Sequence, residues 1–222
     1  MSMERKRGIG KGAGRKRRAY DASGRRAQAE RTRGAILEVA ERIFLSEGYA
    51  GTTVAAVAAA ASVSVETIYK GFNGKAGLVR ALRDLRLAGR GPVHAEARSD
   101  RASHDATDAR EIVAKWGRLA AEVAPMVSPI LLLVRDAAIT DPDMAALQVE
   151  LDDDRLRRMT LNARHLQKGG HLKPGVTLRR AGDVLWTCSS PTLYELLVLS
   201  RKWSAAQYGR FVADSIAAAL LP

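Results

Sequence analysis

The sequence has little of what several protein classes need. It holds one cysteine, Cys188, so no disulfide can form within the chain, and this thiol is expected to be a small core side chain in a reducing cytoplasm. Aromatic residues make up only 5% of the chain, and apolar residues seldom alternate with polar ones as half-buried strands require. No uninterrupted apolar run reaches the roughly 18 residues of a membrane-spanning helix, and no apolar segment follows the basic N-terminus as in a secretory signal. We therefore expect a soluble, cytoplasmic protein without a β-sheet core.

Patterns that carry catalysis are also missing. The four histidines, at positions 94, 104, 165 and 171, lack the spacing of metal ligands. There is no phosphate-binding glycine loop and no nucleophile elbow. The acidic residues 152–154 are consecutive, so their side chains fan around a helix and are expected on a solvated face. The sequence predicts no enzyme, metal or cofactor; a helical enzyme, the alternative, would show turnover and no site-specific DNA affinity.

The residues that are abundant favour helices. Ala, Leu, Arg and Glu lose least on entering a helix, and 46% of the 222 residues are hydrophobic, which is enough for a sizeable core. The sequence therefore predicts an all-α fold.

Positive charge is concentrated at one end of the chain. The net charge is +12, and residues 1–26 hold ten Lys and Arg against Glu4 and Asp21, a net +8. Such a charge indicates an anionic partner, either nucleic acid or an acidic membrane surface. Residues 1–24 also have almost nothing to bury, so we expect a disordered basic arm there.

Residues 25–74 have the pattern of three short helices. Apolar residues at steps of three and four follow Arg25, and Gly48 is a suitable helix end. Thr52 or Thr53 can cap a second helix, and Ser64 can cap a third after a turn at residues 62–63. Two short helices joined by such a turn form a helix-turn-helix candidate.

Residues 75–222 read as a helical bundle. A helix is expected from 75 to about 97 with Leu78, Leu82 and Leu85 facing inward, and a polar loop near residues 99–108. Further helices are expected to end at Pro125 and begin at Pro129, and to run from about 142 to 168. Pro191 is expected to kink or divide a later helix.

The stretch TTVAAVAAAASVSVETIYKGFNGKAGLVRAL, residues 52–82, resembles the DNA-binding domain of the tetracycline-repressor (TetR) family. The preceding helix and the C-terminal segment resemble the family as well, so the likeness covers most of the chain. Three positions depart from the family pattern. Ser62 stands where the turn usually has Gly, which predicts a left-handed backbone at a residue with a Cβ atom. Gly71 replaces a common His or aromatic residue, and Lys202 replaces a common Gly before Trp203.

The resemblance implies how the third helix meets DNA. Val65, Glu66 and Thr67 would face the major groove, with Glu66 accepting a hydrogen bond from cytosine and Thr67 contacting a base or a thymine methyl. Tyr69 would donate to a phosphate, and Lys75 at a helix N-terminus would add a phosphate contact. The full set of expected DNA-binding residues is Arg33, Thr53, Ser64, Val65, Glu66, Thr67, Tyr69, Lys70 and Lys75.

Plainer interpretations stay open for several of these residues. Thr53 can be only a helix cap, Tyr69 only a packed aromatic, and Arg33 and Lys75 only solvated cations. The basic arm can follow the minor groove or the backbone, or can be a tail with non-specific affinity.

The family's C-terminal bundle implies dimerisation and a small-molecule site. A palindromic operator needs a two-fold dimer, and six apolar residues are expected at its interface or, alternatively, in the core of the single chain: Leu193, Leu196, Leu197, Phe211, Val212 and Ile216. Seven residues are candidates to line a ligand cavity, each also compatible with ordinary core or surface: Trp116, Met126, Leu132, Arg135, Met144, His165 and Trp186.

Together these features predict a homodimeric, sequence-specific DNA-binding regulator, a repressor that a small-molecule effector releases from a palindromic operator. The alternative is an effector-independent DNA-coating or architectural protein that uses the basic arm.

Overall fold

The computed structural model describes residues 13–90, 93–105 and 108–222, and all regular structure in these ranges is helical. The all-α prediction is confirmed. The elements are α1 (Ala13–Gly51), α2 (Val54–Ala60), α3 (Val65–Phe72), α4 (Lys75–Leu87), α5 (Ala95–Asp105), α6 (Ala109–Ala137), α7 (Pro142–Lys168), α8 (Leu178–Cys188), α9 (Pro191–Tyr194), the π-helix η1 (Glu195–Ser200) and α10 (Ala205–Leu220).

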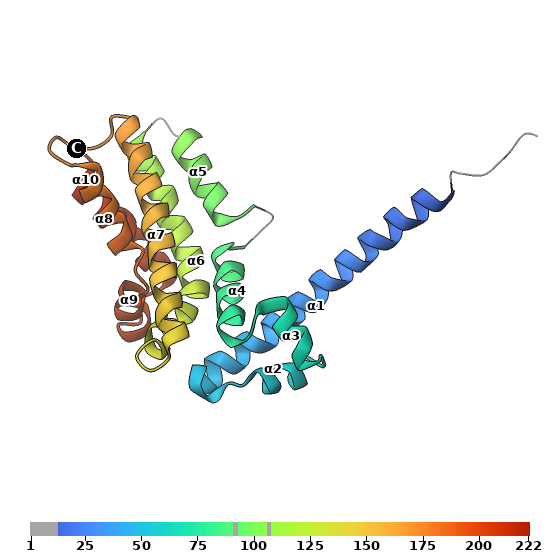
Figure 1. Ribbon diagram of the computed structural model, residues 1–222. Coiled ribbons are helices and arrows are strands. Elements are labelled where there is room, and N and C mark those ends of the chain that lie inside the picture. The colour runs from blue at the N-terminus through green and yellow to red at the C-terminus, as the bar shows by residue number, and fades with distance from the viewer. Residues whose placement is uncertain (1–12, 91–92, 106–107) are drawn as a thin grey trace, which may run out of the picture.

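Helix α1 begins earlier than the sequence predicts. Residues 13–24, expected as part of a disordered arm, are helical. Figure 1 shows the N-terminal part of α1 projecting away from the rest of the molecule. Residues 1–12 of the expected arm lie outside the described residues. The physical reason is that Ala and Arg favour helix, and a helix already formed from residue 25 can extend without a new nucleation step. The regular helix ends at Gly48, whose φ of 72° is left-handed, as predicted.

Helices α2 and α3 form the predicted helix-turn-helix. The Thr53 hydroxyl accepts from Ala56 N, and the Ser64 hydroxyl accepts from Thr67 N, so each helix has the expected side-chain cap. Ser62 in the turn has φ 54°, which confirms a left-handed backbone at a residue that is not glycine. In Figure 1 these two helices lie beside α1 at one end of the molecule, and α4 leads from them to the bundle.

Four expectations about the middle of the chain are wrong. Helix α4 ends at Leu87, Leu85 is 41% exposed, and the segment expected as a polar loop forms α5 as far as Asp105. Helix α6 continues through Pro125 and Pro129 instead of dividing there. Each internal proline costs about 3 kcal/mol, but α6 is the central helix and packs against α1, α4, α5, α7, α9 and α10, so its burial outweighs that cost.

The later elements agree with the sequence. Helix α7 begins at Pro142 with Asp141 as its cap, and Pro191 divides the chain between α8 and α9. Ser204 caps α10, a helix start that the sequence did not predict. Lys202, in the turn before α10, has φ 61°, so a lysine holds a backbone conformation that glycine adopts more readily.

Two large apolar cores hold the described residues together. The first, here called the shared core, joins residues of α1 to α4, such as Phe44 and Ile68, to Ile130 of α6 and Met144 of α7. The second, the bundle core, joins α6, α7, α8, α9 and α10 around Tyr208 and includes the buried Cys188. The shared core therefore crosses the expected boundary between residues 74 and 75.

Helix α6 is long and apolar enough, by length and composition alone, to cross a membrane. Its place at the centre of the bundle, with residues such as Ile112 and Ile130 buried among other helices, is that of a core helix.

Candidate nucleic-acid interface and ligand cavity

Helix α3 divides into a buried face and an exposed face. Ile68 is fully buried and Phe72 nearly so, which fixes the helix against α1 and α4. Val65 is 41% exposed and Tyr69 55% exposed, and Thr67 is also exposed. The residues expected to read bases are therefore all exposed.

The first turn of α3 is held by short hydrogen bonds. The Ser64 hydroxyl accepts from Thr67 N at 3.1 Å and lies 2.9 Å from the Thr67 hydroxyl. Ser64 thus acts as a helix cap that also orients Thr67, which leaves the Thr67 methyl group free for apolar contact.

The charges of α3 largely cancel. Lys70 Nζ lies 2.6 Å from Glu66 Oε1, with 76% of the Lys70 side chain and 72% of the Glu66 side chain exposed. An exposed pair of this kind contributes about 0–1 kcal/mol. Little energy would therefore be needed to separate Glu66 from Lys70 when Glu66 contacts a base.

Lys75, an expected phosphate contact, is bound within the chain. Its ammonium group donates to Tyr49 O at 2.7 Å and to Thr52 O at 3.0 Å, and it lies 3.9 Å from the centre of the Tyr49 ring. A cation in the first turn of α4 opposes that helix's dipole, but these carbonyls follow the end of α1, where a cation is favourable. Lys75 therefore ties α4 to α1.

Burial shifts the pKa values of this pair. Burial raises the pKa of Tyr49 to about 12, with further contributions from the nearby Asp141 and Asp143 charges. Burial also lowers the pKa of Lys75, which the Asp141 charge partly opposes.

Arg33 and Thr53 also have contacts within the chain. Arg33 Nη1 donates to Gly71 O at 2.9 Å, and its guanidinium lies 4.3 Å from the centre of the Phe72 ring. Arg33 remains exposed, so it ties α1 to the end of α3 while staying accessible to a phosphate. Thr53 is exposed and caps α2, so the interpretation of this residue as a helix cap is confirmed.

The structure does not bring the seven candidate ligand residues together. Trp116 lies in the bundle core, Met144 in the shared core, and His165 packs edge-on against His104. Only Arg135 and Trp186 line one pocket, of about 180 Å³, where Arg135 is already paired with Glu195 at 2.6 Å. Leu132 is buried and Met126 half-buried.

A larger cavity, of about 410 Å³, lies elsewhere between α4, α6 and α7, and Tyr208 of α10 reaches it. We call it the α4–α7 cavity. Its walls combine apolar residues of α6 with Arg83 of α4 and three arginines of α7, at positions 155, 157 and 158. Within α7, Asp152 pairs with Arg155 and Asp154 with Arg157, because a spacing of three places the partners on one helix face. This pattern predicts ion pairs but no cavity. Asp152 and Asp154 are ion-paired, so the expectation of a simply solvated run is wrong for both.

The six candidate interface residues also divide. Val212 and Ile216 are buried in the bundle core, whereas Leu196 is 55% exposed and Phe211 37% exposed. The other two, Leu193 and Leu197, are half-buried against the same core.

Sequence comparison supports the assignment of the N-terminal helices. Residues 36–82 match the family of bacterial regulatory proteins described as the tetR family. The chain is 49% identical over 57 residues to the HTH-type transcriptional regulator TtgR of Pseudomonas putida, covering 26% of this chain and 27% of that protein. It is 35% identical over 65 residues to an uncharacterized HTH-type regulator, YvkB of Bacillus subtilis, covering 29% and 34%. The matched segment thus spans about a third or less of these relatives.

Solved structures match over most of the chain. The complex of SmeT with triclosan superposes with a TM-score of 0.67 at 20% identity, covering 86% of this chain and 92% of that one; SmeT is the repressor of the Stenotrophomonas maltophilia multidrug efflux pump SmeDEF. NalD, the secondary repressor of the MexAB-OprM multidrug efflux pump in Pseudomonas aeruginosa, gives a TM-score of 0.67 at 19% identity, covering 87% and 98%. The resemblance of residues 36–82 to the TetR family is therefore confirmed by sequence, and most of the chain shares the fold of SmeT and NalD.

Proposed function

We propose, from the premise that residues 36–82 are a TetR-family DNA-binding segment within that family's fold, that this chain is a cytoplasmic transcriptional repressor. It binds a palindromic operator as a homodimer and is released by a small-molecule effector. The observation that carries the proposal is the outward face of α3, where Val65, Thr67 and Tyr69 are exposed on a helix anchored by Ile68.

Base reading and phosphate binding are assigned to different residues of α3. Glu66 and Thr67 contact base edges, Val65 adds apolar contact, and Tyr69 donates its hydroxyl to a phosphate. The low charge of α3 suits this division, because the attraction to DNA comes from the basic N-terminal segment of α1 and the residues before it.

Selection from a random DNA library tests the assignment. Tyr69→Phe is expected to weaken binding to all sequences alike, because phosphate contacts carry no sequence information. Glu66→Ala is expected to relax the preference at one base pair. Lys70→Ala is the matched control: it removes the partner of Glu66 but keeps the carboxylate, so base preference should persist. A changed preference in Tyr69→Phe, or an unchanged one in Glu66→Ala, would overturn these roles.

The dimer is proposed to form through the exposed apolar side of η1 and α10. Leu196 and Phe211 project there, and Trp203 packs edge-on against Phe211 at 5.6 Å between ring centres. Phe211→Glu is expected to yield monomers in sedimentation and to abolish tight operator binding. Ile139→Glu, at an 82% exposed position in the turn between α6 and α7, is the control and should remain dimeric.

Release is proposed to act through α4. This helix connects the reading helices to the bundle, and the two copies of α3 must lie about 34–36 Å apart to enter successive major grooves. An effector that binds better when α4 has moved would lower operator affinity by that difference in binding free energy. SmeT, which shares this fold, has been solved with triclosan.

The alternative of an architectural DNA-coating protein is supported only by the charge of the N-terminal arm. Footprinting on genomic fragments separates the two functions. Discrete palindromic sites are expected for the repressor, whereas uniform coverage would overturn the proposal in favour of the alternative.

A further inference from the structure

The α4–α7 cavity has an apolar floor. Val127 and Leu131 of α6 and Leu151 of α7 line it, and Val123 lies beside them. Its volume of about 410 Å³ lies within the usual range of small-molecule sites. A ligand that fills it must carry a substantial apolar body.

Three arginines of the cavity are more deeply buried than the carboxylates that pair with them. The side chains of Arg83, Arg155 and Arg158 are 12%, 14% and 17% exposed, whereas their partners Asp154, Asp152 and Asp100 are 31%, 45% and 45% exposed. Each guanidinium is therefore more deeply buried than the carboxylate that pairs with it. Among the cavity's lining residues four arginines face two carboxylates, Glu96 and Asp154, a net charge of +2.

Arg83 has an unused hydrogen-bond donor. Its Nη2 donates to Asp154 Oδ2 at 2.8 Å. Its buried Nε lies 3.3 Å from Asp84 Oδ1 but makes no hydrogen bond within the described residues. A buried donor without an acceptor is unfavourable by about 1–3 kcal/mol. A carboxylate bound in the cavity could accept two bonds from this guanidinium.

We propose that the α4–α7 cavity binds an organic anion with an apolar body, and that the anion takes Arg83 from Asp154. This inference rests on the proposed function, for which it names the class of effector. Asp154 keeps a second partner, Arg157, so it is not left as an unpaired charge. The exchange removes an ion pair that links α4 to α7.

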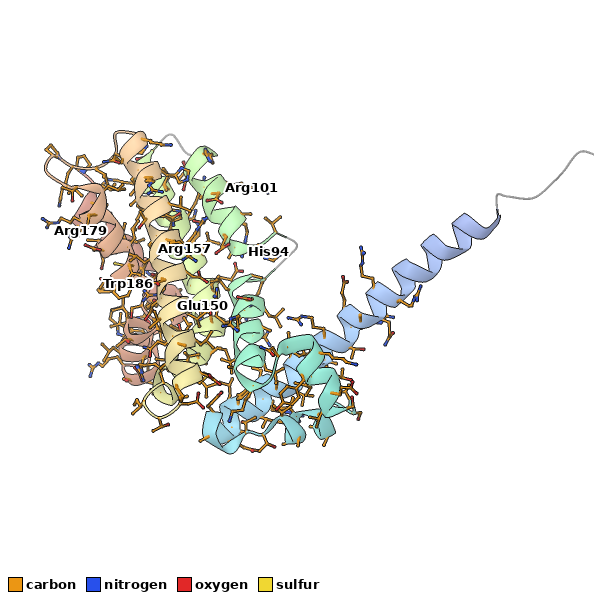
Figure 2. The ribbon with its side chains drawn as sticks, in the orientation of Figure 1. His94, Arg101, Glu150, Arg157, Arg179 and Trp186 are labelled. Carbon is orange, nitrogen blue, oxygen red and sulfur yellow. The ribbon has the colours of Figure 1, made fainter. Side chains whose placement is uncertain are left out.

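A second pair between the same helices provides the comparison. Arg80 of α4 and Glu150 of α7 lie 2.6 Å apart, but both are more than 40% exposed and neither lines the cavity. Figure 2 shows Glu150 on α7 beside α4, with Arg157 further along α7. Of these two pairs between α4 and α7, the Arg83–Asp154 pair is the one that a ligand in the cavity can contact directly.

The probe is 2-naphthoate, with 2-naphthamide and 2-naphthylmethylammonium as neutral and cationic analogues of similar shape. Titration calorimetry on the full chain without DNA is expected to give naphthoate an affinity about tenfold or more above either analogue, a difference of about 1.4 kcal/mol or more. Equal affinities, a preference for the cation, or no binding would overturn the proposed ligand class.

Variants locate the anion. Arg83→Met is expected to weaken naphthoate about tenfold, and Asp154→Asn to strengthen it several-fold because the competing carboxylate is gone. Glu150→Gln is the matched control, and its affinity should stay within about twofold because that pair is exposed. Thermal unfolding identifies variants that fail to fold, and if Arg83→Met is one of them, Asp154→Asn decides alone. Unchanged or weaker binding in Asp154→Asn would overturn the exchange.

Operator binding completes the test. Naphthoate is expected to lower the operator affinity of the unmodified chain about tenfold or more and to have little effect on Arg83→Met. Normal operator binding that naphthoate leaves unchanged would overturn this inference alone. A chain without any site-specific DNA affinity would overturn the proposed function, while the calorimetric result on the cavity would still stand.

Discussion

The shared core and the bundle core are built in different ways. In the shared core, large side chains of α1 to α4 interlock with those of α6 and α7, and Phe44, Ile68, Leu78 and Met144 are fully buried. In the bundle core, helices α6 and α10 approach so closely that a Cβ atom on Gly117 would lie 2.5 Å from Gly209 O and 2.8 Å from Ala213 Cβ. Substitutions that reduce side-chain volume should therefore destabilise the shared core most, and substitutions that add volume should destabilise the bundle core most.

This contrast bears on how the reading helices are attached. Because the shared core includes Ile130 of α6 and Met144 of α7, the DNA-binding segment is not an independent domain joined by a linker. Apolar contact holds α4 to the bundle on one side, and the ion pairs of Arg80 and Arg83 join it to α7 on another. The exposed Arg80–Glu150 pair is worth little energy. Arg83 is largely buried, but its partner Asp154 is also paired with Arg157, so this contact can change partners while the apolar contacts persist.

The largest expected effect comes from emptying the shared core. Met144→Ala, at a fully buried position, should lower the free energy of unfolding by about 2–5 kcal/mol. Urea unfolding followed by circular dichroism measures the loss. Val149→Ala, at a 63% exposed position on the same helix, is the control and should change stability by less than about 0.5 kcal/mol. Equal losses in the two variants would show that the shared core does not depend on α7.

Adding one methyl group tests the bundle core. Gly117→Ala should lower the free energy of unfolding by about 1–3 kcal/mol, because the new Cβ meets the backbone of α10, which cannot move aside easily. Gly71→Ala in α3 is the matched control, since nothing lies within 4 Å of its added Cβ. That substitution should stabilise the chain by about 0.5–1 kcal/mol through helix propensity. The same sign in both variants would contradict the close approach of α6 and α10.

Lys75 lies at the edge of the shared core, and Lys75→Met tests whether this side chain stabilises the fold or contacts DNA. Loss of the two bonds to Tyr49 O and Thr52 O should lower stability by about 1–2 kcal/mol. The dependence of operator binding on salt should stay unchanged, whereas loss of a phosphate contact would reduce the slope by about 0.9 per subunit. Lys70→Met, on the exposed face of α3, serves as the stability control. A reduced slope without a stability loss would restore the phosphate role.

The smallest effect is expected from an ion pair outside both cores. Arg98 donates two hydrogen bonds to Glu122, at 2.8 and 2.6 Å, and these bonds, with one from Arg90 N, lower the pKa of Glu122 to about 2 despite its burial. A lowered carboxylate pKa adds stability above about pH 4.5 that is lost as the pH falls towards 2. Unfolding in urea near neutral pH and at about pH 3 should show a smaller acid-induced loss in Arg98→Met than in the unmodified chain. Identical losses would mean that Glu122 does not depend on Arg98.

Local signals explain which parts of the fold could be predicted. The caps Thr53 and Ser64 act on backbone groups within the next few residues, so their positions in the sequence were sufficient to locate two helix starts. Most of the outward face of α3 follows from the same local periodicity, because burial of Ile68 and Phe72 places Glu66, Thr67 and Lys70 on the opposite side. Val65 lies on the same side as the buried pair by this periodicity, and it is exposed in the first turn of the helix.

Contacts between distant segments account for what could not be predicted. The carbonyl partners of Lys75 lie 23 and 26 residues away, and Arg83 meets Asp154 across 71 residues, so no local pattern identifies either pair. The seven ligand candidates do not line one cavity for the same reason, since a cavity is defined by helices packing side by side and not by the residue types on any one of them. The sequence by itself determined an all-helical chain, its helix-turn-helix and the basic character of its N-terminus, because propensity, capping and charge act over short distances along the chain. Tertiary structure alone decided that α6 passes through two prolines, that one core unites the reading helices with the bundle, and that buried arginines line a cavity beside α4, because burial depends on which distant helices meet.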